Sequence, residues 1–298
     1  MVKKRNHKFL KILAIIAFVI ILFSALGKIF TSNVKNETIV IIPIDGTILS
    51  DSSGAQFGEK ITASTDIIEF LDKANKDKNV KGIILEINSP GGSALASKEI
   101  VDKVKSIEKP IVSWIREVGA SGAYWVASAS DKIIADELSI TGSIGVISSY
   151  LEFSGLLEDY NITYEDLRTG KYKGIQSPYK KLNEEERDIL LKKLEIIHEI
   201  FADDVSKNRG KDLSKIANGL FYLGKEAKDL GLIDELGGKE LAINITKQLA
   251  NITKAEIVRY EKEKGLFDLL SKFGASAFYS FGQGFGSLLV KKDGIRLE

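Results

Sequence analysis

The amino-acid sequence predicts an α/β fold with a mostly parallel sheet, preceded by an N-terminal transmembrane helix. Two observations predict the α/β part. Strand and helix patterns alternate along residues 38–260, and the strand patterns are continuous β-branched runs, which are typical of strands buried on both faces. A third observation predicts the membrane helix: residues 9–30 are apolar and carry no charge between Lys11 and Lys28.

The apolar segment is long enough to cross a bilayer. At about 1.5 Å per residue, residues 9–30 extend over roughly 33 Å. Its N-terminal side is rich in lysine and arginine, and no acidic residue appears before Glu37. The positive-inside rule then places the N-terminus in the cytoplasm. A cleaved secretory signal is the alternative, because ALG at 25–27 resembles a small-residue cleavage site. Both interpretations place the rest of the chain outside.

The elements of the exported part follow in order along the chain. Strands are expected over residues 39–49, 80–89, 110–117, 131–137 and 162–168, and helices over 66–75, after Pro90–Gly92, over 119–130 and from about 184 to 208. Residues 139–147 are broken by glycines. Asn183 and Glu186 have the spacing of a capping box, and Gly210 ends the long helix.

The sequence divides into three parts. Residues 1–30 form the basic tail and membrane anchor, residues 38–260 form one domain, and residues 261–298 form an apolar tail rich in Phe and Gly. The tail fits a surface amphipathic helix, an oligomer contact or a second membrane contact, and it fits equally a terminal helix packed on the domain.

The composition excludes several kinds of active site. The chain has no cysteine, which excludes a cysteine nucleophile, disulfides and thiolate metal sites. Its two histidines are His7 in the basic tail and His198 in a helical pattern, so no two-histidine metal motif can be written. The net charge of +1 does not favour nucleic acid as a partner. No metal or other cofactor is expected.

Two glycine-containing motifs follow predicted strands, where open α/β sheets build their sites. In NSPGGS (88–93), the backbone N–H of Gly92 is a candidate oxyanion donor, although the motif also fits a plain turn. A phosphate-binding P-loop is excluded because GxxxxGK[ST] is absent.

In the second motif, GASGAYW (119–125), Ser121 is a candidate nucleophile and Gly122 is a second candidate oxyanion donor. A closely packed small-residue helix is the alternative.

A nucleophilic serine needs a base, and without a placed histidine the candidates are lysine and carboxylate. An ordinary lysine, with a pKa of about 10.4, is neutral in about one molecule in 2500 at pH 7, so a lysine base requires an apolar site. The segment TGKYKGIQSP (169–178) contains Lys171 and Lys173, and no acidic residue lies between Asp166 and Glu184. Lys173 fits the role, although a solvated loop lysine fits this segment as well.

In this order, SPGG (89–92), GASGAYW (119–125), TGSIGV (141–146) and TGKYKGIQSP (169–178) behind a membrane segment resemble the signal peptide peptidase A family. These are membrane-anchored Ser–Lys serine proteases of the ClpP/crotonase-like fold. The resemblance covers roughly residues 38–260, and FYLGKEAKDLGLIDELGG (221–238) matches the stretch that closes the family's domain. The departure is GAY where bacterial members often have GGY, which puts only the shape of the pocket in doubt.

The resemblance implies a role for each matched residue. Ser121 is the nucleophile, and Lys173, not Lys171, is the general base. Gly92 and Gly122 donate to the oxyanion, and Ser143 hydrogen-bonds the lysine. It also implies a homo-oligomeric ring in which neighbouring subunits share the dyad. Implied substrates are remnant signal peptides and other short apolar segments at the membrane.

Three other functions remain open. The first is a related membrane protease that acts on stomatin-like proteins. The second is acyl-CoA chemistry on a crotonase fold, which needs a cytoplasmic site and usually a carboxylate in place of Lys173. The third is a non-catalytic membrane scaffold that forms rings. The presence of both Ser121 and Lys173 speaks against the scaffold, and the expected topology speaks against acyl-CoA chemistry.

Overall fold

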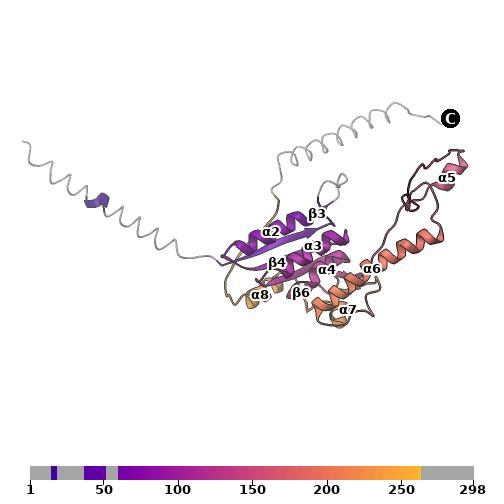
Figure 1. Cartoon of the computed structure of the whole chain (residues 1–298). Helices are drawn as coiled ribbons and strands as arrows, with labels where there is room; N and C mark the ends of the chain where they lie inside the picture. Colours follow the sequence, from indigo (N-terminus) through magenta and orange to yellow (C-terminus); the bar gives the residue numbers. More distant parts are fainter. Residues whose placement is uncertain (1–14, 19–36, 52–59, 263–298) are drawn as a thin grey trace, which may run out of the picture. The chain divides into compact units, whose positions relative to one another are not determined.

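The computed structural model describes residues 15–18, 37–51 and 60–262. Its centre is a sheet with the strand order β10-β1-β4-β5-β6-β9, in which every neighbouring pair is parallel. These strands span Glu256–Arg259, Thr38–Asp45, Val80–Ser89, Ile111–Ala120, Lys132–Ala135 and Glu235–Leu236. The mostly parallel α/β sheet that the sequence predicted is therefore confirmed (Figure 1).

The long strand β5 pairs with two successive strands on one side. Its first half pairs with β6, and its last residues pair with β7, Ile140–Gly142. β7 pairs in turn with the antiparallel strand β8, Phe221–Leu223. A separate parallel pair consists of β2, Thr47–Leu49, and β3, Ile61–Ala63. The pairing of β5 with β7 and of β7 with β8 thereby extends the sheet at the carboxyl end of β5.

Both faces of the central strands are buried. In β1, Ile39 and Ile41 belong to one apolar cluster, whereas Val40, Ile42 and Ile44 belong to the other. This alternation places consecutive residues on opposite faces, so a strand that is buried on both faces must be apolar throughout. The continuous β-branched runs of the sequence have this cause.

Helices complete the two layers around the sheet. The larger cluster joins the sheet to α2, Ser64–Lys76, α3, Ala94–Lys105, and α4, Gly122–Ser128. The smaller cluster joins the opposite face to α8, Lys239–Leu249. The short helix α7, Gly224–Leu230, connects β8 to β9.

The longest helix, α6, runs from Glu184 to Arg209 and only its last part enters the core. The predicted capping box of Asn183 and Glu186 is present, and Gly210 ends the helix with φ 61°. Near its C-terminal end Phe201 stacks on Trp125 of α4, with ring centroids 4.6 Å apart. The Trp125 indole N–H also donates to Asp204, 3.2 Å away.

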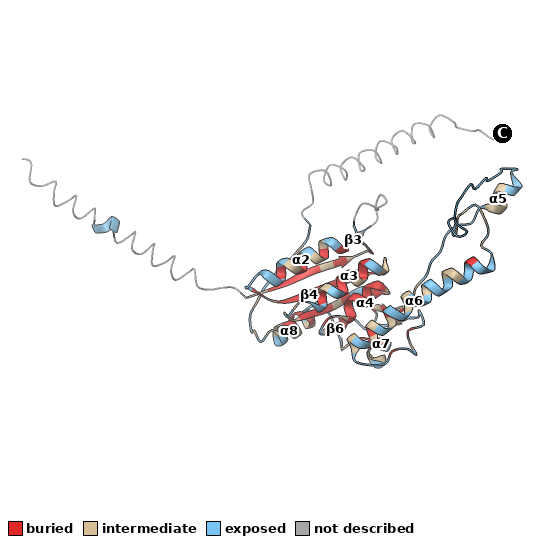
Figure 2. Ribbon diagram, viewed as in Figure 1, coloured by how far each residue is buried: buried red, intermediate tan, exposed pale blue. Residues whose placement is uncertain are grey.

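We call residues 146–200 the arm. They comprise a loop, the short helix α5, Ser154–Asp159, the segment with Lys173, and the first part of α6. Glu186, near the start of α6, is the only buried residue among them, and Figure 2 shows α5 in the colours of exposed and intermediate residues. The sheet, in contrast, is mostly buried.

Two details differ from the sequence prediction. Residues 162–168, predicted as a strand, form none: all seven are exposed, and they have no sheet partner despite their strand-like composition. Residues 39–49 form two strands instead of one, because Gly46 turns the chain with φ 74°.

The predicted anchor and tail fall mainly outside the described residues. Of residues 9–30 only 15–18 are described, and they are helical. Across the described ranges, no helix is both long enough and apolar enough to span a membrane. The chain divides into two units, residues 1–260 and 261–298, and of the second only Glu261 and Lys262 are described.

Candidate active site

Three parallel strands end at one edge of the sheet, and each is followed by a predicted site residue. Ser89 at the end of β4 pairs with Gly119 of β5, and Ala120 of β5 pairs with Gly142 of β7. Three segments therefore leave the sheet side by side. They carry Gly92, Ser121 and Ser143, respectively. Carboxyl ends of parallel strands are where open α/β sheets form sites.

Ser121 has a strained backbone. Its φ of 53° and ψ of −128° lie in a region that residues with a Cβ rarely adopt, and such strain costs about 1–3 kcal/mol. The conformation is held from both sides, because the Ser121 N–H donates to the Gly142 carbonyl at 2.8 Å and the Ser121 carbonyl accepts from Trp125 N–H at 3.0 Å. Strain of this kind is concentrated at functional sites.

The side chain of Ser121 is available for chemistry. It is partly exposed at the point where β5 passes into α4, and its hydroxyl has no hydrogen-bond partner among the described residues. A serine placed in this way presents its oxygen at the sheet edge.

The loop of residues 90–93, which we call the glycine loop, is held in place by β2. Ile48 donates its N–H to the Gly91 carbonyl at 2.9 Å, and its own carbonyl accepts from Ser93 N–H at 2.8 Å. In an extended segment, alternate residues direct their backbone groups to opposite sides. The N–H of Gly92 is thereby directed away from β2, and it has no acceptor among the described residues. A Cβ on Gly92 would lie 2.1 Å from the Ile48 carbonyl oxygen, so this close approach requires glycine.

Gly122 supplies a second free donor on the other side of Ser121. It is the first residue of α4, and its N–H also has no acceptor in the described part of the chain. The glycine loop contacts this point directly, because a Cβ on Gly91 would lie 2.7 Å from Gly122 N and 2.9 Å from Ser121 Cβ. Two unpaired N–H groups beside a serine hydroxyl are the arrangement that stabilises an oxyanion in acyl transfer.

Ser143 lies beside Ser121. It follows Gly142, whose carbonyl binds Ser121 N–H, and its own N–H donates to Leu220 at 2.8 Å. Its φ of 51° is again in the left-handed region. The structure thus brings together four of the five predicted site residues: Gly92, Ser121, Gly122 and Ser143.

Lys173 is the exception, because it lies in the arm. Its side chain is exposed and forms no ion pair or hydrogen bond with any described residue. Its neighbours Lys171 and Tyr172 bind Glu185, at the start of α6. Glu185 lies roughly 24 Å along the helix axis from Phe201, which packs on α4. Within one chain, Lys173 is therefore distant from Ser121.

The two lysines of this segment differ in their surroundings. The hydrogen bonds that Lys171 makes to Glu185 and to Tyr172 raise the pKa of Lys171, and Lys171 in turn lowers the pKa of Glu185. The shortest Lys171 Nζ to Glu185 carboxylate distance is 2.6 Å. Lys171 is thus held as a cation in an ion pair, which leaves Lys173 as the lysine of this segment without a carboxylate partner in the described structure.

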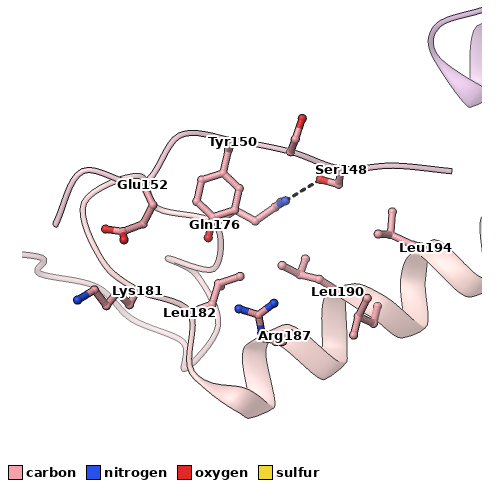
Figure 3. Close-up of a pocket in the computed structure, with 11 residues that line it drawn as sticks. Ser148, Tyr150, Glu152, Gln176, Lys181, Leu182, Arg187, Leu190 and Leu194 are labelled. Atoms are coloured by element: carbon pink, nitrogen blue, oxygen red, sulfur yellow. Dashed lines mark hydrogen bonds between the residues drawn. The ribbon is translucent and has the colours of Figure 1, made fainter. Parts of the chain in front are cut away.

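A cavity of about 530 Å³ opens within the arm (Figure 3). It lies between the start of α6, which contributes Leu190 and Leu194, and the loops around Tyr150 and Gln176. The Gln176 amide donates to the Ser148 hydroxyl at 3.0 Å across it. None of the five predicted site residues lines this cavity, so it is a feature of the arm and not of the serine site.

Sequence reasoning missed the part of the site that β2 provides. The signal was Gly46, which interrupts the apolar run 39–49 and allows Ile48 to turn towards the glycine loop. It also missed Ser97 on α3, whose side chain lies against Gly122.

Comparisons with known proteins identify proteases as relatives of this chain. The model of peptidase family S49 matches residues 103–253, and that of Clp protease matches residues 49–139. A putative protease of Methanocaldococcus jannaschii is 39% identical over 229 residues, covering 74% of this chain and 72% of that protein. A putative signal peptide peptidase of Enterococcus faecium is 34% identical over 235 residues, covering 77% and 68%.

Solved structures support the same fold. The 1510-N membrane-bound stomatin-specific protease, as a lysine-to-alanine variant in complex with a substrate peptide, superposes with a TM-score of 0.52. The alignment covers 80% of this chain and 97% of that one at 14% identity, so it supports the fold alone.

The S49 match covers about half of the chain and includes Ser121, and the two relatives align over more than two thirds of their own lengths. The chain is therefore a serine protease of peptidase family S49, and within S49 it belongs to the signal peptide peptidase A family.

Proposed function

We propose that this protein cleaves peptides through a Ser–Lys dyad, with Ser121 as nucleophile and Lys173 as general base. The observation that carries the proposal is the strained Ser121 between two unpaired backbone N–H groups, those of Gly92 and Gly122. This geometry fits acyl transfer, because it places donors where negative charge develops on a carbonyl oxygen.

The reaction runs in two halves. Neutral Lys173 accepts the Ser121 proton as the serine oxygen attacks the peptide carbonyl, and the Gly92 and Gly122 N–H groups stabilise the oxyanion. The tetrahedral intermediate collapses, the C–N bond breaks, and Lys173 returns the proton to the leaving amine. Water, deprotonated by Lys173, then attacks the acyl ester, the bond to the Ser121 oxygen breaks, and Lys173 returns the proton to that oxygen as the free acid is released. Ser143 hydrogen-bonds the lysine and orients it.

Lys173 comes from a second copy of the chain. The separation of Lys173 from Ser121 within one chain supports this, since a base must come within hydrogen-bond distance of its nucleophile. The arm also carries many exposed large apolar side chains, including Ile147 and Leu167, which are 90% and 89% exposed. Contact with another copy would bury them. A contact that joins the arm of one copy to the serine site of the next is heterologous, and such a contact forms a ring when its rotation closes. The proposed assembly is a ring of this kind.

The substrates are remnant signal peptides and other short apolar segments at the membrane. The name of the Enterococcus faecium relative supports this substrate class. The apolar segment 9–30 forms a single-pass anchor with the N-terminus in the cytoplasm and the protease domain, residues 38–260, outside. The exposure of Ile15, Ile16 and Phe18 in the short described piece of that segment agrees with a lipid environment.

A related specificity is the second candidate. Its ground is the name of one structural neighbour, a membrane-bound stomatin-specific protease, and it would consist of cleavage of stomatin-like membrane proteins by the same dyad.

The test is cleavage of a short apolar fluorogenic peptide by the full-length protein in detergent, from pH 6 to 10. We expect Ser121→Ala and Lys173→Ala each to reduce kcat at least about a thousandfold, as for other catalytic nucleophiles and bases. Lys171→Ala is the matched control, because it removes a lysine two residues away and should keep most of the activity. The rate of the wild-type protein should rise with pH, since only a neutral amine accepts a proton.

Two results would redirect the proposal. Full activity in Lys173→Ala would assign the base to another residue. A wild-type protein that forms its assembly and cleaves none of a varied peptide set would favour a non-catalytic membrane scaffold. Comparing an apolar signal-like peptide with one derived from a stomatin-like protein distinguishes the two specificities.

A further inference from the structure

The Ser97 side chain is an unusual feature of the core behind the serine site. Ser97 is completely buried on α3, and its hydroxyl has no hydrogen-bond partner among the described residues. A buried helical serine commonly donates to the carbonyl four residues earlier. Here the Ser93 carbonyl accepts only the Ser97 backbone N–H, at 3.0 Å. A buried hydroxyl without a partner destabilises a fold, so alanine at this position would be the more stable choice.

The Ser97 hydroxyl lies against Gly122, the proposed oxyanion donor. A Cβ on Gly122 would be 2.2 Å from Ser97 Oγ and 3.1 Å from Ser97 Cβ, so Ser97 occupies the space that any side chain at 122 would need. The same Cβ position is 3.5 Å from the Gly92 nitrogen. Ser97, Gly122 and Gly92 thus meet at one point.

This contact connects the two halves of the proposed oxyanion hole. Gly92 immediately precedes Ser93, which is the N-cap of α3, and Ser97 is one turn into that helix. Gly122 is the first residue of α4. A rigid contact between Ser97 and Gly122 therefore sets how far apart the two N–H donors lie. Oxyanion holes depend on this distance, since each donor must lie about 2.7–3.1 Å from the oxyanion.

We propose that Ser97 is a positioning residue for the proposed reaction: its hydroxyl, wedged between α3 and Gly122, holds the Gly92 and Gly122 N–H groups at the separation that an oxyanion requires. The inference rests on the proposed function. It assigns to Ser97 no contact with the substrate, and it explains why position 122 must be glycine.

The first test compares Ser97→Ala with wild type in the same peptide assay and in thermal unfolding. We expect kcat to fall on the order of tenfold with KM unchanged, because the donors are used fully only in the transition state. The Tm should stay the same or rise, since an unpartnered hydroxyl is removed. Ser97→Cys, which keeps an atom at this point, should recover most of the lost kcat.

The matched control is Ser128→Ala in α4. Ser128 is also buried, but its hydroxyl donates to the Trp125 carbonyl at 2.6 Å and accepts from Asn208 at 3.0 Å. Its removal should lower Tm and leave kcat unchanged, the opposite of the pattern for Ser97→Ala.

A paired substitution tests the contact itself. Gly122→Ala should abolish most activity, and adding Ser97→Gly should restore part of it, because the nearest remaining atom would then be Gly92 N at 3.5 Å. The inference is overturned if Ser97→Ala keeps full kcat, if its kcat falls only together with Tm, or if Ser97→Gly does not improve Gly122→Ala. The Ser121→Ala variant distinguishes failure of the proposed function from failure of this inference. Full activity of Ser121→Ala overturns both. Loss of activity in Ser121→Ala, together with normal activity in Ser97→Ala, overturns the inference alone.

Discussion

The sheet core and the arm are built on opposite principles. In the core, apolar side chains such as Ile42, Ile84 and Leu85 have no exposed surface. In the arm, the single buried residue is a glutamate, Glu186, which is bound by Lys180 and by its own helix cap. The tyrosines of the arm are exposed, as are several of its leucines and isoleucines.

The difference indicates what each region does. Burial of apolar surface stabilises the core by itself, and the core holds Ser121, Gly92 and Gly122 in a fixed and partly strained geometry. The arm buries too little to be stabilised in that way, and its exposed apolar surface suits contact with another molecule. If the nucleophile belongs to the core and the base to the arm, assembly is what completes the site.

The strongest test of this comparison mixes two inactive variants. Ser121→Ala lacks the core half of the dyad, and Lys173→Ala lacks the arm half. When equal amounts are dissociated and reassembled together, we expect about a quarter of the sites to regain both residues if each site joins neighbouring copies at a heterologous interface. Peptide cleavage by the mixture, against either variant alone, measures this.

The control is a mixture assembled from separately formed oligomers without dissociation, which should stay inactive. Inactivity of the reassembled mixture, with oligomers of normal size, would place the base in the same copy as the nucleophile and end the division of roles between core and arm.

A pair of matched truncations tests the energetic side of the comparison. Ile42→Ala in the core should lower the free energy of unfolding by about 2–5 kcal/mol, because it leaves a cavity among buried side chains. Ile147→Ala in the arm should change it by less than about 0.5 kcal/mol, because that side chain is exposed. Urea unfolding of the two variants measures the difference.

The arm variant should instead affect assembly. Sedimentation of Ile147→Ala is expected to show dissociation at higher protein concentration than the wild type, while Ile42→Ala assembles normally below its unfolding transition. A large loss of unfolding free energy in Ile147→Ala would mean that the arm is part of the cooperative core.

The sequence was sufficient to predict most of the core. Strand β4 has the predicted bounds, 80–89, and α6 begins at its predicted cap, because these signals are local: a buried run and a capping box. Gly92, Ser121 and Gly122 were candidates for a related reason, because their motifs follow predicted strands and parallel strands end at one edge. Ser143 was implied only by the family resemblance.

The arm was the part that local patterns could not predict. Residues 162–168 have the composition of a strand, but a strand needs a neighbouring strand, and the arm offers none. The segment with Lys173 binds the start of α6, whereas the serine site packs near the other end of that helix. No spacing in the sequence reveals the resulting distance between Lys173 and Ser121. The sequence also could not predict the unpartnered hydroxyl of Ser97, because it depends on how α3 and α4 pack against each other.

The smallest expected effect concerns one carboxylate in each region. In the core, burial alone would raise the pKa of Asp234, but the hydrogen bond and charge of Arg209, with the Ile133 N–H, outweigh it and hold the pKa below its usual value. A lowered pKa in the folded state means that this stabilisation is complete above the unfolded value of about 3.9 and is lost as pH falls through the folded pKa. Asp234→Asn should therefore lower the free energy of unfolding at pH 7 by about 1.5–3 kcal/mol, with a smaller difference from wild type near pH 3.

The arm carboxylate should not behave in this way. The pKa of Glu185 is also lowered, by its hydrogen bonds with Lys171 and with Tyr172, but the side chain is half exposed and solvent screens the pair. Glu185→Gln should therefore leave the free energy of unfolding unchanged at both pH values. Urea titrations of the two variants at pH 7 and pH 3 measure this. Equal losses in both variants would show that the arm pair is as well shielded from water as Asp234, which would contradict the contrast between a buried core and an exposed arm.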